Sequence, residues 1–332
     1  MKTLRLEITE EGISKAGEII RKGGLVAFPT ETVYGLGADA LNADAVRAVY
    51  AAKGRPSDNP MIVHIAEVED VYDLATEVNE STKKLMEAFW PGPVTFVLPK
   101  KSIVPDATTG GLGTVAVRLP ASETARKVIA ASERPIAAPS ANISGKPSPT
   151  TAEDVLEDMD GRIDAVLMGE ACGVGIESTV IDCTGETPVI LRPGFVTAEM
   201  VSEILGKECA IDPHLLEKPS EILDPAEGSA DADFKPKSPG MKYKHYSPEA
   251  RVRIVEGDPA PYKKEAEEEG IRTAVLDYKG DTGEAARRFF ADLRELDRQG
   301  IELILVCAIE EKGLGFSIMN RMLKSAGYDV IN

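Results

Sequence analysis

The sequence predicts an α/β fold in two parts, and three observations support this. In the first part, short apolar runs alternate with segments of helical spacing, as expected for a sheet covered by helices. From about residue 206 to 250, prolines, acids and small residues dominate and no period emerges. After residue 250 strand and helix patterns alternate regularly, which predicts a small parallel Rossmann-like domain. We therefore expect domains over residues 1–206 and 251–332, joined by a linker over 207–250.

The period of the apolar residues predicts the individual elements. Helical spacing in the first domain predicts helices over residues 13–22, 43–52, 71–78, 81–89 and 197–205. Short apolar or alternating runs predict strands at 25–28, 61–65, 94–98, 114–119, 136–138, 165–168, 179–182 and 189–191. The last domain is expected to contain strands 252–255, 273–276 and 303–306 and helices 262–269, 284–299 and 316–326. Gly313 and Gly315 precede the last of these helices without the third glycine of a dinucleotide fingerprint, so we assign them only a helix-entry role.

Composition excludes several functional classes. The 332 residues carry a formal net charge of -17, which argues against broad attraction to nucleic acid or anionic membrane. No run approaches the roughly twenty apolar residues that span a bilayer, and the first residues lack a signal-peptide core, so we expect a cytoplasmic protein without a membrane partner. The four cysteines form no C-x-x-C pair and are expected to be reduced and structural. No clustered carboxylates indicate a metal site in the protein.

Two short basic stretches stand out in this acidic chain, at residues 53–60 and 140–148. Their glycines and prolines shape irregular backbone, and their lysine, arginine, serine and asparagine side chains offer donors that suit phosphate oxygens. We interpret them as two walls of one anion pocket, which implies a nucleotide substrate. The alternative for any single lysine is a solvated surface position. A Walker A loop is absent, because Pro147 follows Lys146 where that motif has serine or threonine.

Two further candidates lie on predicted strands. Alternation over residues 114–119 places Thr114, Ala116 and Arg118 on one face, where an arginine can grip a carboxylate with both nitrogens. The alternative is that Arg118 pairs with a structural acid. His64 is flanked by apolar residues, and the sequence alone favours a core histidine there.

The linker's latter half, residues 238–248, is aromatic and basic. We interpret it as a ligand-covering lid in which Ser238, Tyr243, His245 and Tyr246 take part. The alternative is a segment docked along a domain surface.

Taken together, these motifs resemble the signature of the YrdC/Sua5 family, the threonylcarbamoyl-AMP synthases. The resemblance covers nearly the whole chain and rests on residues 28–37, 53–56, 140–142, 177–180, 192–194, 239–241 and 245–248. It implies a YrdC-like twisted open α/β sheet with a concave basic face, followed by a linker and a small Sua5 domain. The implied reaction joins L-threonine, bicarbonate and ATP into threonylcarbamoyl-AMP and releases pyrophosphate. The product feeds N6-threonylcarbamoyladenosine at position 37 of tRNAs that read codons starting with A, so a downstream threonylcarbamoyltransferase and tRNA are the implied partners.

The resemblance also assigns roles to residues. Lys53 and Arg55 are the implied catalytic residues, and they stabilise the charge that builds on the leaving group. The implied ATP ligands are Lys53, Arg55, Asn59, Thr114, Ser140, Asn142, Ser148 and Arg192. The implied threonine ligands are Thr32, His64, Arg118, Ser178 and the backbone of Ala138. Mg²⁺ is expected to bind mainly through ATP and pyrophosphate oxygens.

Four alternatives accompany these assignments. Arg192 has the alternative of a strand-end salt bridge, and residues 28–37 taken alone have the alternative of a structural turn. For the whole chain, a double-stranded RNA or tRNA-binding module is the alternative function, which the overall acidity weakens. Carbamoyl transfer in hydrogenase maturation is a further rival, but the zinc-finger cysteine pairs of that machinery are missing from this sequence.

Overall fold

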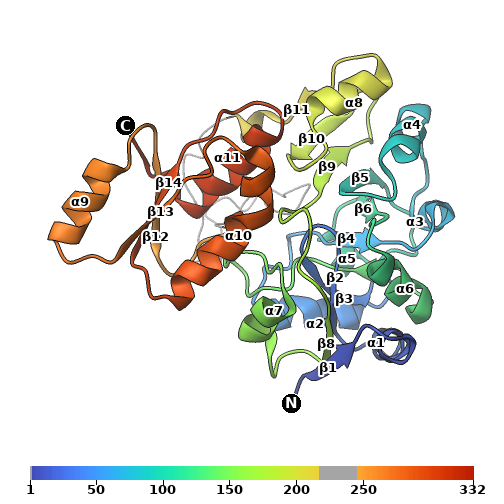
Figure 1. Ribbon diagram of the computed structural model, residues 1–332. Coiled ribbons are helices and arrows are strands. Elements are labelled where there is room, and N and C mark those ends of the chain that lie inside the picture. The colour runs from blue at the N-terminus through green and yellow to red at the C-terminus, as the bar shows by residue number, and fades with distance from the viewer. Residues whose placement is uncertain (1, 217–244) are drawn as a thin grey trace.

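The computed structural model describes residues 2–216 and 245–332, and it is a mixed α/β protein built on two sheets (Figure 1). The large sheet has 11 strands among the described residues, in the order β1-β8-β2-β3-β7-β4-β6-β5-β9-β10-β11. The small sheet has 4 strands in the order β13-β14-β12-β15, and all of its pairs are parallel. The predicted α/β fold and the parallel C-terminal sheet are therefore confirmed.

The strands of the large sheet are β1 (Leu4–Glu7), β2 (Val26–Pro29), β3 (Tyr34–Asp39), β4 (Ile62–His64), β5 (Val94–Pro99), β6 (Thr114–Arg118), β7 (Ile136–Ala137), β8 (Ala165–Met168), β9 (Thr179–Asp182), β10 (Val189–Arg192) and β11 (Ala210–Ile211). The helices around it are α1 (Glu10–Arg21), α2 (Ala43–Lys53), α3 (Val71–Leu74), α4 (Glu80–Phe89), α5 (Asp106–Thr109), α6 (Glu123–Ser132), α7 (Ala152–Met159) and α8 (Ala198–Leu205), with 3-10 turns at Val68–Asp70 and Pro213–Leu215. The C-terminal region consists of β12 (Arg251–Val255), α9 (Ala260–Glu268), β13 (Thr273–Leu276), α10 (Thr282–Arg298), β14 (Leu303–Cys307), α11 (Leu314–Ser325) and β15 (Val330–Ile331).

Local sequence signals explain where many helices begin. A side-chain oxygen caps the first turn of each of six helices around the large sheet, from Thr9, Asn42, Asn79, Ser122, Thr151 and Thr197. At the other end of α2, Gly54 takes a left-handed conformation (φ 63°), which ends the helix and releases the basic stretch after it. In the C-terminal region, Gly313 is the residue before α11, as the sequence predicts.

Alternation along β6 holds as predicted. Val115 and Val117 pack into the main core, while Ala116 packs on the opposite face with Ile62 and Leu191. Arg118 shares this second face, and β6 pairs with β4 so that Arg118 lies beside His64. The two strand candidates for substrate binding are thus neighbours in the sheet.

Several predicted boundaries differ from the structure. The helix predicted over residues 71–78 ends at Leu74, because Ala75 forms a β-bridge with Lys100 instead. Residues 34–39 are the strand β3 rather than a loop. Its glycines are needed for packing, since a Cβ on Gly37 would lie 2.6 Å from the Phe28 ring. Strand β1 and helices α6 and α7 were not predicted, and β11, inside the predicted linker, extends the large sheet beside β10.

The C-terminal region packs against the large sheet through α10 and α11, which lie between the two sheets in Figure 1, whereas α9 lies on the outer side. Val33 and Ile176, from loops of the large sheet, belong to the same apolar cluster as Phe289 and Phe290 of α10. Loops of the first part therefore extend the apolar core of the C-terminal region.

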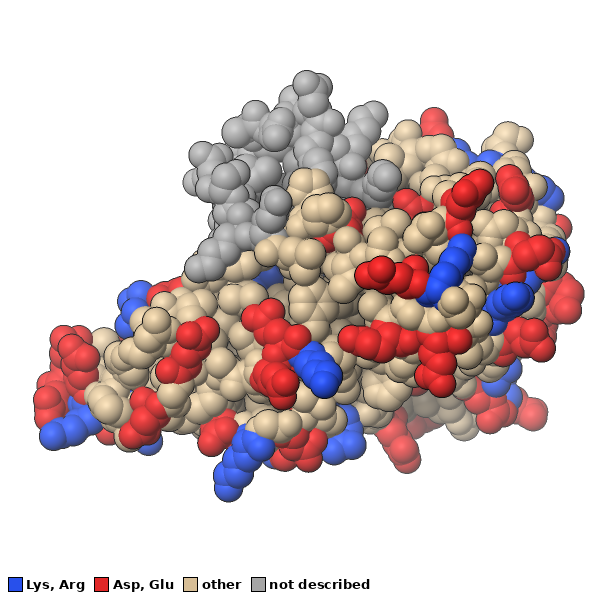
Figure 2. All heavy atoms as spheres, turned by 90° about the horizontal axis from the view of Figure 1, so that it is seen from above, with Lys and Arg blue, Asp and Glu red and all other residues tan. Residues whose placement is uncertain are grey.

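The exterior reflects the acidic composition. Asp and Glu side chains are spread over the face shown in Figure 2, with Lys and Arg scattered among them. None of the helices in the described part of the chain is long and apolar enough to cross a membrane.

Candidate active site

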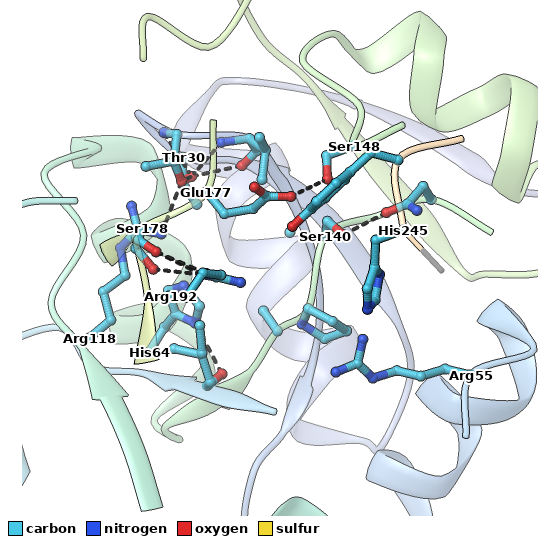
Figure 3. A pocket seen from close by; sticks show the side chains of 18 of the residues that line it. Thr30, Arg55, His64, Arg118, Ser140, Ser148, Glu177, Ser178, Arg192 and His245 are labelled. Carbon is cyan, nitrogen blue, oxygen red and sulfur yellow. Dashed lines mark hydrogen bonds between the residues drawn. The ribbon is translucent and has the colours of Figure 1, made fainter. Parts of the chain in front are cut away.

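One pocket gathers most of the residues that the sequence singles out (Figure 3). It lies where the loops after β2, α2, β7 and β8 meet the ends of β4, β6 and β10. Its walls are formed by Thr30, Thr32, Val33, Gly35, Arg55, Ile62, His64, Arg118, Ala138, Pro139, Ser140, Asn142, Lys146, Ser148, Glu177, Ser178, Arg192, His245 and Tyr246. Thus both predicted walls, and every predicted threonine ligand, line one cavity.

Lys53 joins the two basic stretches but does not line the pocket. The residue is only 2% exposed, and its ammonium donates to the carbonyl oxygens of Ser140 and of Asn142, the latter at 2.5 Å. In return, the amide of Ser144 donates to the Lys53 carbonyl at 2.9 Å. Burial, reinforced by the nearby Arg55 charge, lowers the pKa of Lys53 well below its usual value. The sequence predicts that Lys53 faces phosphate. In this structure its side chain instead connects the first basic stretch to the second.

Arg55 does face the pocket. Its guanidinium donates to the carbonyl of Pro60 at 3.0 Å and to that of Asn59 at 3.4 Å, which fixes its direction. Burial lowers its pKa to about 10, so it stays charged at neutral pH. The Asn59 side chain is buried outside the lining, and Thr114 also lies outside it, at the far end of β6 from Arg118. Both predicted ATP ligands therefore lie off the cavity wall.

Arg118 is almost fully buried, at 4% exposure, and makes contacts in three directions. It donates to the Thr32 hydroxyl at 3.0 Å and the Gly92 carbonyl at 3.3 Å, and it forms an ion pair with Glu31 at 2.6 Å. Burial alone would raise the pKa of Glu31, but the Arg118 charge outweighs it and the net shift is downward. The alternative pairing with an acid is therefore present, and the guanidinium still lines the cavity.

His64 is both a core residue and a lining residue. It is 3% exposed and its Nδ1 lies 3.2 Å from the Ile62 carbonyl. Burial, together with the Arg118 charge, lowers its pKa to about 3. His64 is therefore a neutral polar group at the wall of the pocket.

Arg192 and Ser178 meet at the ends of β10 and β9. The guanidinium donates to the Ser178 carbonyl at 2.9 Å and lies 3.1 Å from its hydroxyl, and that hydroxyl is 2.8 Å from Thr95. Figure 3 shows Arg192 and Arg118 on the same side of the cavity, opposite Ser148. The oxygens that accept from Arg192 are neutral, and the nearest opposite charge is that of Glu177, which the Arg321 charge also offsets.

Sequence reasoning missed three polar lining residues. Thr30, whose hydroxyl is 2.8 Å from that of Thr32, precedes a predicted ligand by two positions. Glu177 accepts from the Ser148 hydroxyl at 2.6 Å and directly precedes Ser178. Lys146 stands inside the second basic stretch itself. Proximity to the predicted ligands was the available signal for all three.

The returning end of the linker reaches the pocket. His245 and Tyr246 line it, whereas the other two lid candidates, Ser238 and Tyr243, lie outside the described residues. Tyr246 has a φ of 64°, unusual for a residue other than glycine, and its ring stacks 5.0 Å from that of Phe290 on α10. The C-terminal region therefore holds Tyr246 in place at the pocket.

Comparison with known proteins identifies the family of this chain. A family profile described as "Telomere recombination", which groups Sua5, YciO and YrdC, matches residues 18–194. A second profile, described as "Threonylcarbamoyl-AMP synthase, C-terminal domain", matches residues 196–327. The chain belongs to the Sua5/YrdC family.

Two relatives in this family are similar over nearly the whole length of both chains. It is 48% identical over 346 residues to the threonylcarbamoyl-AMP synthase of Pyrococcus abyssi, covering 99% of this chain and 98% of the relative. The Bacillus subtilis threonylcarbamoyl-AMP synthase is 42% identical over 363 residues, with full coverage of both chains. The crystal structure of P. abyssi Sua5 complexed with L-threonine superposes with a TM-score of 0.88 at 46% identity, covering 100% of this chain and 99% of that one.

Proposed function

We propose that this Sua5/YrdC family member joins L-threonine, bicarbonate and ATP into threonylcarbamoyl-AMP and releases pyrophosphate. The observation that carries the proposal is the convergence of Arg55, Arg118 and Arg192 on one cavity. Hydroxyl and amide groups from the second basic stretch line the same cavity, so it offers donors for phosphate oxygens beside a separate arginine for a carboxylate. The full-length similarity to enzymes named threonylcarbamoyl-AMP synthase supports the same reaction.

The chemistry needs no covalent nucleophile from the protein. The threonine amine adds to the carbon of bicarbonate with loss of water, or to carbon dioxide derived from bicarbonate with loss of a proton from the amine, and either route gives a carbamate. A carbamate oxygen then attacks the α-phosphorus of ATP, the bond to the β-phosphate oxygen breaks, and pyrophosphate leaves. The protein contributes by holding the two anions side by side and by stabilising the charge on the leaving group.

We assign these tasks to the two ends of the pocket. Arg118, with Thr32, holds the threonine carboxylate, while neutral His64 adds a polar group there without further charge. On the nucleotide side, we assign Arg55 to the triphosphate. Arg192 lies on the same side of the cavity as Arg118 (Figure 3), and we assign it to the phosphate that faces the threonine carbamate. Ser140, Asn142 and Ser148 line the nucleotide side as well. Their hydroxyl and amide hydrogens are donated within the protein, Ser148 to Glu177 and Ser140 to Asn142, so the serine oxygens are placed to accept from ribose hydroxyls.

Mg²⁺ enters as part of the ATP substrate. No cluster of three or more His, Cys, Asp or Glu side chains suited to a metal occurs within the described ranges, so the triphosphate and water would supply most of its ligands. The ion neutralises phosphate charge that the arginines alone would have to balance.

The product is an activated acyl-adenylate, and a threonylcarbamoyltransferase that modifies position 37 of tRNA would consume it. The cytoplasm remains the expected location. The alternative of an RNA-binding module predicts tight, steeply salt-dependent tRNA binding without pyrophosphate release. Titration of the purified protein with tRNA across salt concentrations separates the two.

The decisive experiment follows label from bicarbonate. We expect ¹⁴C-bicarbonate to enter an adenylate only when threonine and ATP are both present, with one pyrophosphate released per labelled product. Label incorporation without threonine, or ATP turnover without incorporation, would overturn the proposal.

A further inference from the structure

Two buried arginines of the C-terminal region reach the pocket's supporting residues. Arg321 of α11 is 0% exposed and Arg294 of α10 is 5% exposed. Taking a guanidinium out of water costs several kcal/mol unless its nitrogens are paired and hydrogen-bonded. Both arginines find these partners in the first part of the chain, at loops that form the cavity.

Arg321 acts on Glu177. Its Nε and Nη2 both lie 3.4 Å from Glu177 Oε2, and its Nη1 donates to the Pro193 carbonyl and, at 3.1 Å, to the Ser317 carbonyl. The other carboxylate oxygen, Oε1, accepts the Ser148 hydroxyl at 2.6 Å. A continuous chain of contacts therefore runs from α11 through Glu177 to a side chain in the pocket wall, and Figure 3 shows its last link.

Arg294 contacts the backbone next to Ser148. It donates to the Pro147 carbonyl at 2.7 Å and forms an ion pair with Asp158 at 2.8 Å. Asp158 in turn accepts the amide of Ile143 at 3.2 Å, which lies in the same basic stretch. Ser148 is thus fixed from its backbone side by α10 and from its hydroxyl side through α11.

The close approach of α10 is built into the sequence. Gly175, two residues before Glu177, has a φ of 80°, and a Cβ there would lie 2.3 Å from the Ala286 carbonyl. Only glycine lets this loop meet the helix so closely. Hence the position of Glu177 depends on the C-terminal region on two counts.

We propose that Arg294 and Arg321 are positioning residues for the nucleotide side of the pocket, so that the C-terminal region completes the ATP site without touching ATP. This inference rests on the proposed function, which places ATP beside Ser148. It assigns the region a role in substrate binding in addition to its share in the core.

The test compares Arg321→Met with Arg298→Met in the full-length chain. Arg298 is a control for the bridge alone. It is more exposed than Arg321, but it also joins the two parts, through Asp154 and Glu157 at 3.1 Å, and neither of these acids lines the pocket. For Arg321→Met we expect the KM for ATP to rise at least about tenfold and the KM for threonine to stay within about twofold. For Arg298→Met we expect both constants to stay within about twofold.

Two further variants separate positioning from folding. Glu177→Gln combined with Arg321→Met removes the charge pair together, so melting temperature should recover while the KM for ATP stays raised. Arg294→Met should also raise the KM for ATP, and unlike the double variant it keeps Glu177 in the pocket lining. This variant replaces Arg321→Met in the test if Arg321→Met fails to fold. Equal changes in both substrates' constants, or no difference between Arg321→Met and the control, would overturn the inference.

The outcomes also distinguish the two proposals. Binding of a non-hydrolysable ATP analogue, measured by calorimetry, reports on positioning even if no adenylate forms. If wild-type protein binds the analogue and Arg321→Met weakens this binding, but the wild-type protein incorporates no bicarbonate, only the proposed reaction is refuted. If the wild-type protein is active and Arg321→Met behaves like Arg298→Met, only the positioning role is refuted.

Discussion

Replacing Lys53 by methionine tests whether this side chain joins the pocket walls or binds phosphate. Methionine keeps the apolar stem and removes the ammonium, so the carbonyls of Ser140 and Asn142 lose their donor inside the protein. An unpaired buried polar group costs about 1–3 kcal/mol, and part of this is offset because the ammonium no longer has to be desolvated. We therefore expect a net loss of about 2–4 kcal/mol of stability.

For domains of about 150–250 residues, 1 kcal/mol corresponds to roughly 2–4 °C, so the melting temperature should fall by about 5–15 °C. Scanning calorimetry measures it, with Lys127→Met as control, since exposed Lys127 only pairs with Glu123. Because the walls separate, the KM for ATP should rise as well. A variant with unchanged melting temperature that has lost pyrophosphate release would refute the structural role and favour direct phosphate contact.

Three further predictions concern side chains that line the pocket. Arg118→Leu in a Glu31→Gln background, which avoids an unpaired buried acid, should weaken threonine binding by about 10–100-fold in calorimetry and leave ATP affinity unchanged, and equal losses would contradict the carboxylate assignment. Arg55→Ala should lower pyrophosphate release by a factor of about 10² or more, whereas wild-type turnover would remove this residue from the mechanism. His64 has a pKa of about 3 when folded and 6.5 as its ordinary value, so between these pH values only the unfolded chain binds the proton and stability falls as pH falls. Urea unfolding should show about 2 kcal/mol less stability at pH 5 than at pH 7 from this residue, and His64→Gln should lack that component, while an identical pH dependence in both proteins would rule out the burial argument.

The fold was predictable where the signal is local. Alternation over residues 114–119 depends only on neighbours in sequence, and it correctly placed Arg118 on the face opposite the main core. Strand β3 was not predicted because Gly35 and Gly37 suggest a turn, whereas in the structure Gly37 makes room for Phe28. Helix α7 was missed although Thr151 and Asp154 form a capping box, a signal that the sequence does contain.

The site was predictable as a set of loops but not as a set of contacts. The resemblance to the family gathered the lining residues correctly into one group, yet it placed Lys53 on phosphate, while the structure buries its ammonium between carbonyls. The contact between Glu177 and Arg321 joins residues 144 positions apart. No spacing rule relates such residues, because their distance is determined by packing of two separate sheets.

The partners of the buried cations show how an acidic protein can hold a strongly anionic substrate. Arg55 and Arg192 donate to neutral oxygens, and Glu177, the acid close to Arg192, is also paired with Arg321, so the nucleotide side keeps a net positive charge. Arg118 is paired with Glu31, which leaves the threonine end close to neutral. This difference suits the two substrates, because a triphosphate is highly charged whereas an amino acid carries one charge of each sign. With a net charge of -17 and acidic side chains spread over the face shown in Figure 2, the chain offers little electrostatic attraction to an extended polyanion, whereas the arginines of the cavity attract a compact one.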